Sequence, residues 1–160
     1  MQLLIAAIGR LKQGPERELA HHYAGRIDAA GPGVALAPLT IVELAEGRGP
    51  SPSLRKADEA ERLLSTLGKA QALVVLDETG KPHSSRQFAA LLALQRDSGC
   101  ARLGFVLGGP DGLSPALRQR ATCVLPLGTM TLPHGLARIV VLEQIYRAVT
   151  ILSGHPYHRD

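Results

Sequence analysis

Short apolar segments alternate with longer amphipathic segments along most of this chain, and this alternation restricts the folds that it can adopt. The short segments have the length of strands, and the longer ones have the length and periodicity of helices. Strands separated by helices predict an α/β fold, in which a mostly parallel sheet carries helices on both faces. The expected strands are Leu3–Ile8, Val34–Leu44, Ala72–Asp77, Leu103–Leu107 and Thr122–Leu125.

Polar residues and prolines mark the starts of the expected helices. Glu16 and Glu18 suit the first turn of a helix, where the helix dipole favours negative charge. Ser53 is the expected N-cap of a helix with a clear apolar stripe, and Ser114 followed by Pro115 is typical of a short helix. The expected helices cover residues 15–29, 53–67, 84 or 85 to 97, 115–120 and 134–152.

Length and composition indicate one domain, residues 1–160, with an aliphatic core. Hydrophobic residues make up 45% of the chain but aromatic residues only 3%, so leucine, valine, isoleucine and alanine must fill the core. Pro38 interrupts the second strand and predicts an edge position for it. The net charge of +4 permits a nucleic-acid partner without requiring one.

The start of the chain and its cysteines favour a cytoplasmic protein with no membrane partner. The first apolar run, Met1 to Ile8, is too short to span a membrane and has no basic leader before it. Cys100 and Cys123 are interpreted as small buried hydrophobes in a reducing compartment. No group of ligand-type residues has the spacing of a metal site.

Two common phosphate-binding motifs are missing. The first strand continues into Gly9 and Arg10 without the glycine pattern of a dinucleotide fold, and Gly80-Lys81 is followed by Pro82 in place of the serine or threonine of a P-loop. The sequence therefore argues against binding of dinucleotides or nucleoside triphosphates by these motifs.

Loops rich in glycine or small residues nevertheless follow three of the expected strands. They are Asp77–Lys81, Gly108–Gly112 and Leu127–Pro133. Ligands bind at the carboxyl ends of parallel strands, and glycine lets the backbone approach a flat ligand such as adenine. The alternative is that Gly108 and Gly109 only form a turn. Asp77 and Glu78 are interpreted as groups that order their loop.

The last helix is apolar on more than one face. Its apolar positions include Leu136, Ile139, Val140, Leu142 and Ile145. A helix that is apolar nearly all round needs cover on two sides. We expect the sheet on one side and a second copy of the chain, in an isologous dimer, on the other. The alternative is a central helix inside a monomer.

Four segments of the second half resemble those of one known family. LDETGKPHSSRQFA, GFVLGGPDGLS, TMTLPHGLARIVVLEQIYRA and GHPYHRD occur in an order and spacing similar to the RlmH family. These are small SPOUT-class methyltransferases that act on a pseudouridine of bacterial large-subunit ribosomal RNA. The resemblance is specific from about Leu76 to Asp160 and implies a homodimeric α/β protein with a trefoil knot in its carboxyl-terminal part.

The resemblance also implies S-adenosylmethionine as the methyl donor, bound in the knot. Its site would lie at the strand-end loops described above. Gly128 departs from the small polar residue expected at that position, which affects a side-chain contact but not a backbone one. The implied cofactor-binding residues are Leu76, Gly108, Leu127, Gly128, Thr129, Met130, Thr131 and Leu132.

The end of the chain is interpreted as the catalytic segment. Methyl transfer to N3 of pseudouridine requires removal of the N3 proton. His158 could act as base or relay, Tyr157 as hydrogen-bond donor or stacking partner, and Arg159 could stabilise negative charge. The hypothesis is that this tail crosses the dimer interface and completes the active site of the partner subunit. His155 is expected to be structural.

Three further residues are candidate RNA contacts. They are Arg10 after the first strand, and His134 and Arg138 in the last helix. The expected substrate is a structured stem-loop, recognised by shape on the assembled ribosome. Two alternatives remain open: a SPOUT methyltransferase for another RNA, and a ribosome-assembly protein without catalytic activity.

Overall fold

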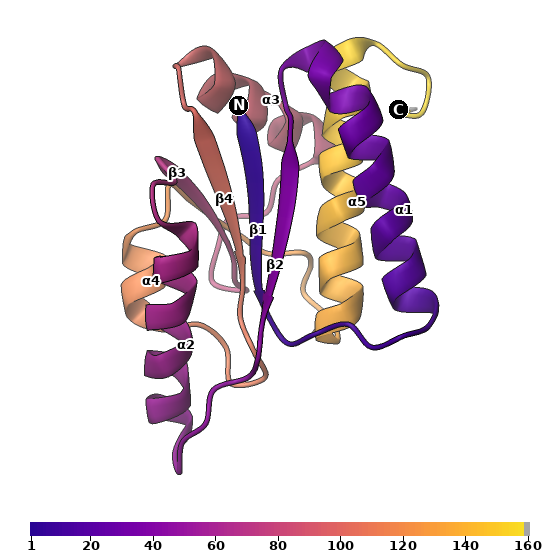
Figure 1. The fold of residues 1–160 in the computed structure, drawn as a ribbon. Helices are drawn as coiled ribbons and strands as arrows, with labels where there is room; N and C mark the ends of the chain where they lie inside the picture. Colours follow the sequence, from indigo (N-terminus) through magenta and orange to yellow (C-terminus); the bar gives the residue numbers. More distant parts are fainter. Residues whose placement is uncertain (159–160) are drawn as a thin grey trace.

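A five-stranded parallel sheet forms the middle layer of the computed structural model, which describes residues 1–158 (Figure 1). The strand order is β2-β1-β4-β3-β5, and every neighbouring pair is parallel. This confirms the predicted α/β class. The strands are β1 (Gln2–Ile8), β2 (Leu39–Leu44), β3 (Ala72–Leu76), β4 (Arg102–Leu107) and β5 (Cys123–Leu125).

Helices cover both faces of the sheet, as Figure 1 shows. One face carries α1 (Pro15–Ala30), α3 (Ser85–Asp97) and α5 (His134–Ser153). The other carries α2 (Pro52–Leu67) and the short α4 (Pro115–Gln119). A 3-10 turn (Gly31–Val34) follows α1. No helix within residues 1–158 combines the length and the apolar character that crossing a membrane requires.

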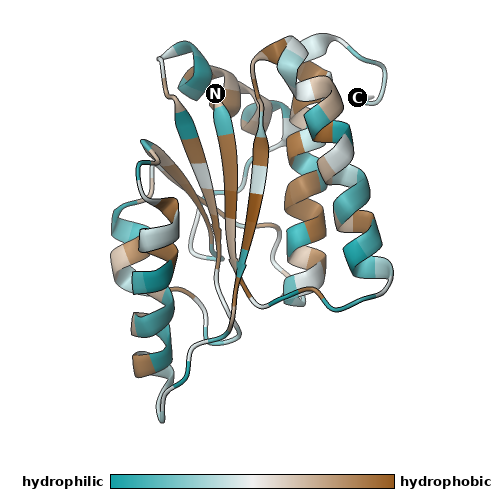
Figure 2. Cartoon of the chain, viewed as in Figure 1, coloured by the Kyte–Doolittle hydropathy of each residue, from teal (hydrophilic) through white to brown (hydrophobic). Residues whose placement is uncertain are grey.

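The alternation of side chains along β1 explains the two layers. Leu3 and Ile5 join the core beneath α1, α3 and α5, whereas Leu4 and Ala6 join the core beneath α2 and α4. Successive side chains of a strand point to opposite faces, so a strand covered on both faces is apolar throughout. Figure 2 shows this as hydrophobic colouring along the central strands.

One helix cap and one strand start differ from the sequence prediction by two residues or more. Helix α2 is capped by Ser51, whose Oγ accepts a hydrogen bond from Leu54 N, so Ser53 lies inside the first turn. Pro52 then occupies the first helical position, which suits its fixed φ. The second strand begins only at Leu39, after Pro38, but it does lie at the sheet edge.

Helix α5 is more fully covered by its own chain than we expected. It packs on the sheet between α1 and α3, and its buried residues include Ile139, Leu142, Ile145 and Val149. Much of the apolar surface that predicted a second subunit is therefore satisfied within one chain. The homodimer remains a prediction, as does the threading of the chain into a knot.

Candidate functional site

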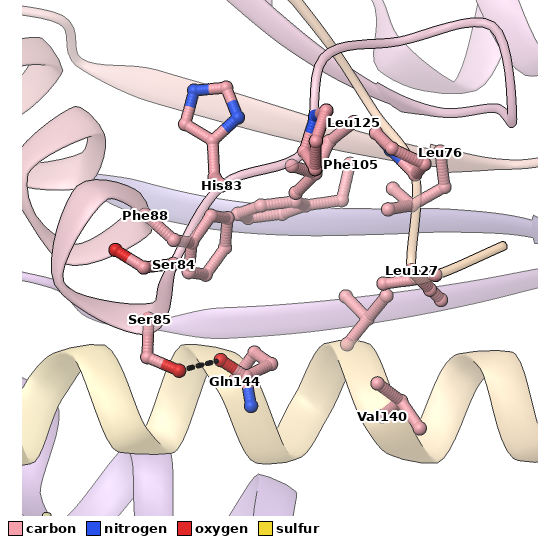
Figure 3. A pocket seen from close by; sticks show the side chains of 14 residues that line it. Leu76, His83, Ser84, Ser85, Phe88, Phe105, Leu125, Leu127, Val140 and Gln144 are labelled. Atoms are coloured by element: carbon pink, nitrogen blue, oxygen red, sulfur yellow. Dashed lines mark hydrogen bonds between the residues drawn. The ribbon is translucent and has the colours of Figure 1, made fainter. Parts of the chain in front are cut away.

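A pocket of about 360 Å³ lies at the carboxyl ends of β3 and β5, between the start of α3 and the middle of α5 (Figure 3). This volume falls within the usual range for small-molecule sites, and the position is where parallel sheets bind ligands. The lining residues are Leu76, Pro82, His83, Ser84, Ser85, Phe88, Phe105, Leu125, Pro126, Leu127, Gly128, Val140, Val141 and Gln144.

Three predicted cofactor residues line this pocket: Leu76, Leu127 and Gly128. Gly128 has a φ of 140°, a conformation that L side chains rarely adopt, so glycine suits this position.

The other predicted cofactor residues lie outside the pocket lining. The side chain of Met130 is 82% exposed, and Thr129 and Thr131 beside it are exposed as well. Leu132 is half-buried, and Gly108 packs closely against Leu113. Contacts between these residues and a cofactor remain predictions.

The polar edge of the pocket comes from residues that sequence reasoning had assigned no ligand role. Ser85 Oγ donates a hydrogen bond to Gln144 Oε1 over 2.8 Å, and His83 Nδ1 lies 2.8 Å from the Lys81 carbonyl oxygen. Figure 3 shows Ser85 and Gln144 at one side of a slot whose lining also includes the apolar side chains of Leu127 and Val140, with His83 and Ser84 at the start of α3. Such a slot suits a flat heteroaromatic ring with polar edges.

The loop after β3 crosses β5 at close range and forms one wall of this region. Asp77 N donates to the Leu125 carbonyl over 3.2 Å. A side chain at Gly80 would overlap the Val124 carbonyl, so only glycine fits this crossing without a shift.

The carboxylate of Asp77 orders this loop, in agreement with its interpretation from the sequence. It accepts from Thr79 N and Oγ1 and pairs with Arg118 over 3.0 Å. Burial opposes the charged form, but these hydrogen bonds and Arg118 hold the pKa of Asp77 below its usual range. Asp77 is therefore charged and fully engaged at neutral pH.

The tail folds back onto α5 of its own chain. The rings of Tyr157 and Tyr146 are 4.8 Å apart in an edge-to-face contact, and the Arg147 guanidinium lies 5.0 Å from the centre of the Tyr157 ring. His158 Nδ1 lies 3.4 Å from Arg147 Nη1. Arg159, the third predicted catalytic residue, lies outside the described residues.

The carboxylate of Glu143 joins the tail to the pocket wall. Its Oε1 accepts from Tyr157 OH over 3.1 Å and from Arg147 Nε over 2.9 Å, while its Oε2 accepts from Gln144 Nε2 over 2.7 Å. Gln144 in turn bonds Ser85 in the pocket. A continuous set of hydrogen bonds therefore connects the pocket to the predicted catalytic tail within one chain.

This packing predicts that Tyr157 stays protonated at alkaline pH. Burial, a hydrogen bond with Tyr23 and the nearby Glu143 charge raise the pKa of Tyr157 above its ordinary value of 10.0. The contribution of Tyr157 to the free energy of unfolding should be fully present below pH 10 and decrease at higher pH. The reason is that Tyr157 ionises at a lower pH in the unfolded chain than in the folded protein. The tyrosinate absorbance of Tyr157→Phe is subtracted from that of the wild type at each pH. The resulting titration curve should have its midpoint well above pH 10. A difference titration centred near pH 10 would contradict this packing.

The three predicted RNA contacts lie in different environments. Arg10 is exposed and His134 is half-buried at the start of α5. Arg138 is only 2% exposed: it pairs with Glu43 and donates to the Gly9 carbonyl over 2.9 Å. Burial lowers the pKa of Arg138, and Glu43 opposes this effect. Its burial argues against the predicted surface contact and gives it a structural role.

No group of three or more histidine, cysteine or acidic side chains within residues 1–158 could hold a metal ion. The described residues provide an apolar slot, hydrogen-bonding side chains at its edge, and the side chains of the tail.

A parallel sheet with a pocket at its strand ends is common to many ligand-binding α/β proteins, and comparison with known proteins identifies the family. The chain belongs to the SPOUT methyltransferase family, since the model described as a predicted SPOUT methyltransferase matches residues 1–158. Its curated relatives include two proteins that are both called ribosomal RNA large subunit methyltransferase H. The one from Brucella anthropi is 49% identical over 160 residues and covers both chains completely. The one from Rhizobium meliloti is 52% identical over 159 residues and covers 99% of each.

Solved structures support the fold. A probable methylase family protein from Haemophilus influenzae matches with a TM-score of 0.53 and 11% identity, over 99% of this chain and 70% of that chain. At this identity the match shows a shared fold and nothing about substrate.

Proposed function

We propose that this protein transfers a methyl group from S-adenosylmethionine to N3 of a pseudouridine in a stem-loop of 23S ribosomal RNA, in the bacterial cytoplasm. The observation that carries the proposal is that helix α5 holds both a wall of the pocket, at Gln144, and the anchor of the tail, at Glu143, so a dimer packed on this helix would bring groups that can handle a proton to a donor site. The full-length relatives named as large-subunit ribosomal RNA methyltransferases support the substrate class.

The pocket residues fit the adenosine part of the proposed cofactor. Leu76, Leu127 and Val140 offer apolar surface for the ring, while Ser85 and Gln144 offer polar groups at one edge. The bound cofactor would supply an activated methyl group on its sulfonium. The protein then has to hold that group, orient the acceptor base and remove one proton.

The environment of the tail divides the roles of its residues. A raised pKa keeps Tyr157 protonated at neutral pH, so its hydroxyl acts as a hydrogen-bond donor and not as the base. Glu143 and Tyr146 fix the orientation of this ring. His158, close to the Arg147 guanidinium, is then the group in the described tail best suited to accept the N3 proton. Arg159 is assigned the stabilisation of developing negative charge.

An isologous dimer would place each tail at the pocket of the other chain. The outward face of α5 carries Leu136, which is 43% exposed, and the half-buried Val140, Glu143 and Arg147. The tail anchor and the pocket wall lie on this same helix. A second copy packed against α5 would therefore bring a pocket close to the partner's Tyr157 and His158.

Methyl transfer to ribosomes from cells that lack the gene tests the function. Labelled S-adenosylmethionine is incubated with assembled ribosomes, free large subunits and naked 23S RNA, and the product is mapped by mass spectrometry. We expect one methylated pseudouridine, the best activity on assembled ribosomes, and a rate that falls with salt because phosphate contacts are screened. Ribosomes from cells with the gene are the control and should accept no label. Labelling of another nucleotide, or none on any substrate, would contradict the proposal.

A further inference from the structure

A second cavity, of about 140 Å³, lies on the other side of α5 from the main pocket. It is enclosed by α1, by β2 near its carboxyl end and by the segment that follows β1. Its polar lining consists of Arg17 and His21 from α1, Glu43 from β2 and Arg138 from α5. Three of these four side chains are of basic residue types.

The floor of the cavity holds a buried cation that is only partly satisfied. Arg138 uses its two terminal nitrogens for Glu43 and for the carbonyls of Ile8 and Gly9. Its Nε is buried and has no hydrogen-bond partner among residues 1–158. Buried donors of this kind are normally paired, so the missing partner points to a group from outside the described chain.

The rim of the cavity carries two further side chains that can contact an anion, the guanidinium of Arg17 and the imidazole of His21. Arg17 and His21 lie one helical turn apart on α1, and both are exposed. Neither forms a hydrogen bond or ion pair with any other residue from 1 to 158. Arg17 also lies in the first turn of α1, where the helix dipole disfavours a cation and favours the neighbouring Glu16 and Glu18. An anion bound at the rim would offset the unfavourable interaction of Arg17 with the helix dipole.

The acidic member of the lining is already neutralised. Glu43 Oε1 accepts from Leu11 N over 3.0 Å and also pairs with Arg138. The floor is therefore an ion pair without net charge, and Arg17 adds one positive charge at the rim. Electrostatics at this site favours an anionic group.

The size and position of the cavity indicate what kind of anion it receives. A volume of 140 Å³ accommodates a phosphate group but not a nucleotide, so the remainder of a larger ligand must lie outside. The start of α1 adjoins the start of α5, since the Glu16 carboxylate packs against Gly135. The cavity therefore lies at the carboxyl edge of the sheet, the same edge as the main pocket.

We propose that this cavity is a phosphate subsite in which Arg17 and His21 hold a phosphodiester of the RNA that carries the methyl acceptor. The subsite rests on the proposed RNA substrate and extends it by assigning a backbone contact at a distance from the reacting base. Arg138 supports the subsite from below. It acts on binding and not on the methyl-transfer step itself.

The salt dependence of ribosome binding tests the subsite. Arg17→Ala should weaken binding about tenfold at low salt and reduce the slope of log affinity against log salt by about one, as expected for one lost phosphate contact. KM should rise while kcat is unchanged. Arg17→Lys should restore most of the slope. The matched control is Lys69→Ala, which removes the same charge from the exposed turn between α2 and β3 at the opposite edge of the sheet.

Solution NMR distinguishes the two possible sources of the anion, free phosphate and RNA. The Arg17 and His21 side-chain resonances are followed during addition of inorganic phosphate and, separately, of a short single-stranded RNA. Shifts of both side chains with RNA at lower concentration than with phosphate support the subsite. Shifts with phosphate alone, or none with either ligand, would overturn it.

The subsite and the proposed reaction can fail independently. If ribosomes accept no methyl group but Arg17→Ala still lowers the salt slope, the subsite stands and the reaction does not. If methyl transfer proceeds and Arg17→Ala behaves like Lys69→Ala, the subsite is wrong.

Discussion

Deletion of residues 157–160 is expected to reduce methyl transfer by about 100- to 10,000-fold, the range that one general acid–base group contributes. The deletion removes Tyr157, His158 and Arg159. Glu143 then loses its hydrogen bond from Tyr157, and Arg147 loses its contact with His158. The pocket loses no lining residue, so affinity for S-adenosylmethionine should stay within about twofold. Single-turnover methylation of ribosomes and calorimetric cofactor binding measure the two quantities.

Shorter changes identify which tail residue matters. Deletion of Asp160 alone is the control and should leave activity near that of the wild type. His158→Ala should reproduce most of the loss if His158 removes the proton, whereas Tyr157→Phe should retain more activity. Mixed dimers of the truncated chain with a chain defective in its pocket should recover activity if the tail serves the partner's site. Full activity of the truncated protein would contradict the assignment of the tail as the catalytic segment.

Gly80→Ala is expected to be the most damaging small substitution in the chain. The added Cβ would overlap the Val124 carbonyl and lie 2.8 Å from Leu125 N, and both are backbone atoms that cannot rotate away. We expect a loss of about 3 kcal/mol in the free energy of unfolding, at the upper end for overpacking. Displacement of β5 would also move Leu125 and Leu127 in the pocket and weaken cofactor binding.

Gly25→Ala is the matched control for this substitution. Gly25 lies inside α1, and a Cβ there meets nothing within 4 Å. Alanine should be neutral or stabilise the protein by up to about 1 kcal/mol, since glycine is a poor helix former. Chemical denaturation of both variants makes the comparison. Equal stability of Gly80→Ala and the wild type would mean that β5 and the loop after β3 do not cross as closely as described.

The sequence predicted the layers of the fold because each strand and helix has a local signature. The apolar run 3–8 and the capping box of Ser84 with Gln87 need no distant partner to be recognised. Ser53 was mistaken for a cap because Ser51, two residues earlier, has the same chemistry. Periodicity also could not show that α1 and α3 flank α5, since a helical stripe does not identify what covers it.

The site was predicted only where it coincides with strand ends. That rule selected the loop that begins at Leu127, whereas Leu76 and the cofactor roles were implied by the family resemblance. The hydrogen bond between Ser85 and Gln144 joins residues 59 positions apart, and the pair of Arg138 with Glu43 spans 95 positions. Neither pairing leaves a local pattern in the sequence. Arg17 and His21 were missed for the same reason, because their significance depends on the cavity that α5 closes.

Helix α5 carries a wall of the pocket at Val140 and Gln144 and the anchor of the tail at Glu143 and Arg147. One inserted residue would turn everything beyond it by about 100° and shift it by about 1.5 Å. Insertions and deletions within 140–147 should therefore be rarer among functional descendants of this gene than substitutions there. In the proposed dimer, the spacing of side chains along this helix would set the distance between the methyl donor in one pocket and the proton acceptor on the partner's tail.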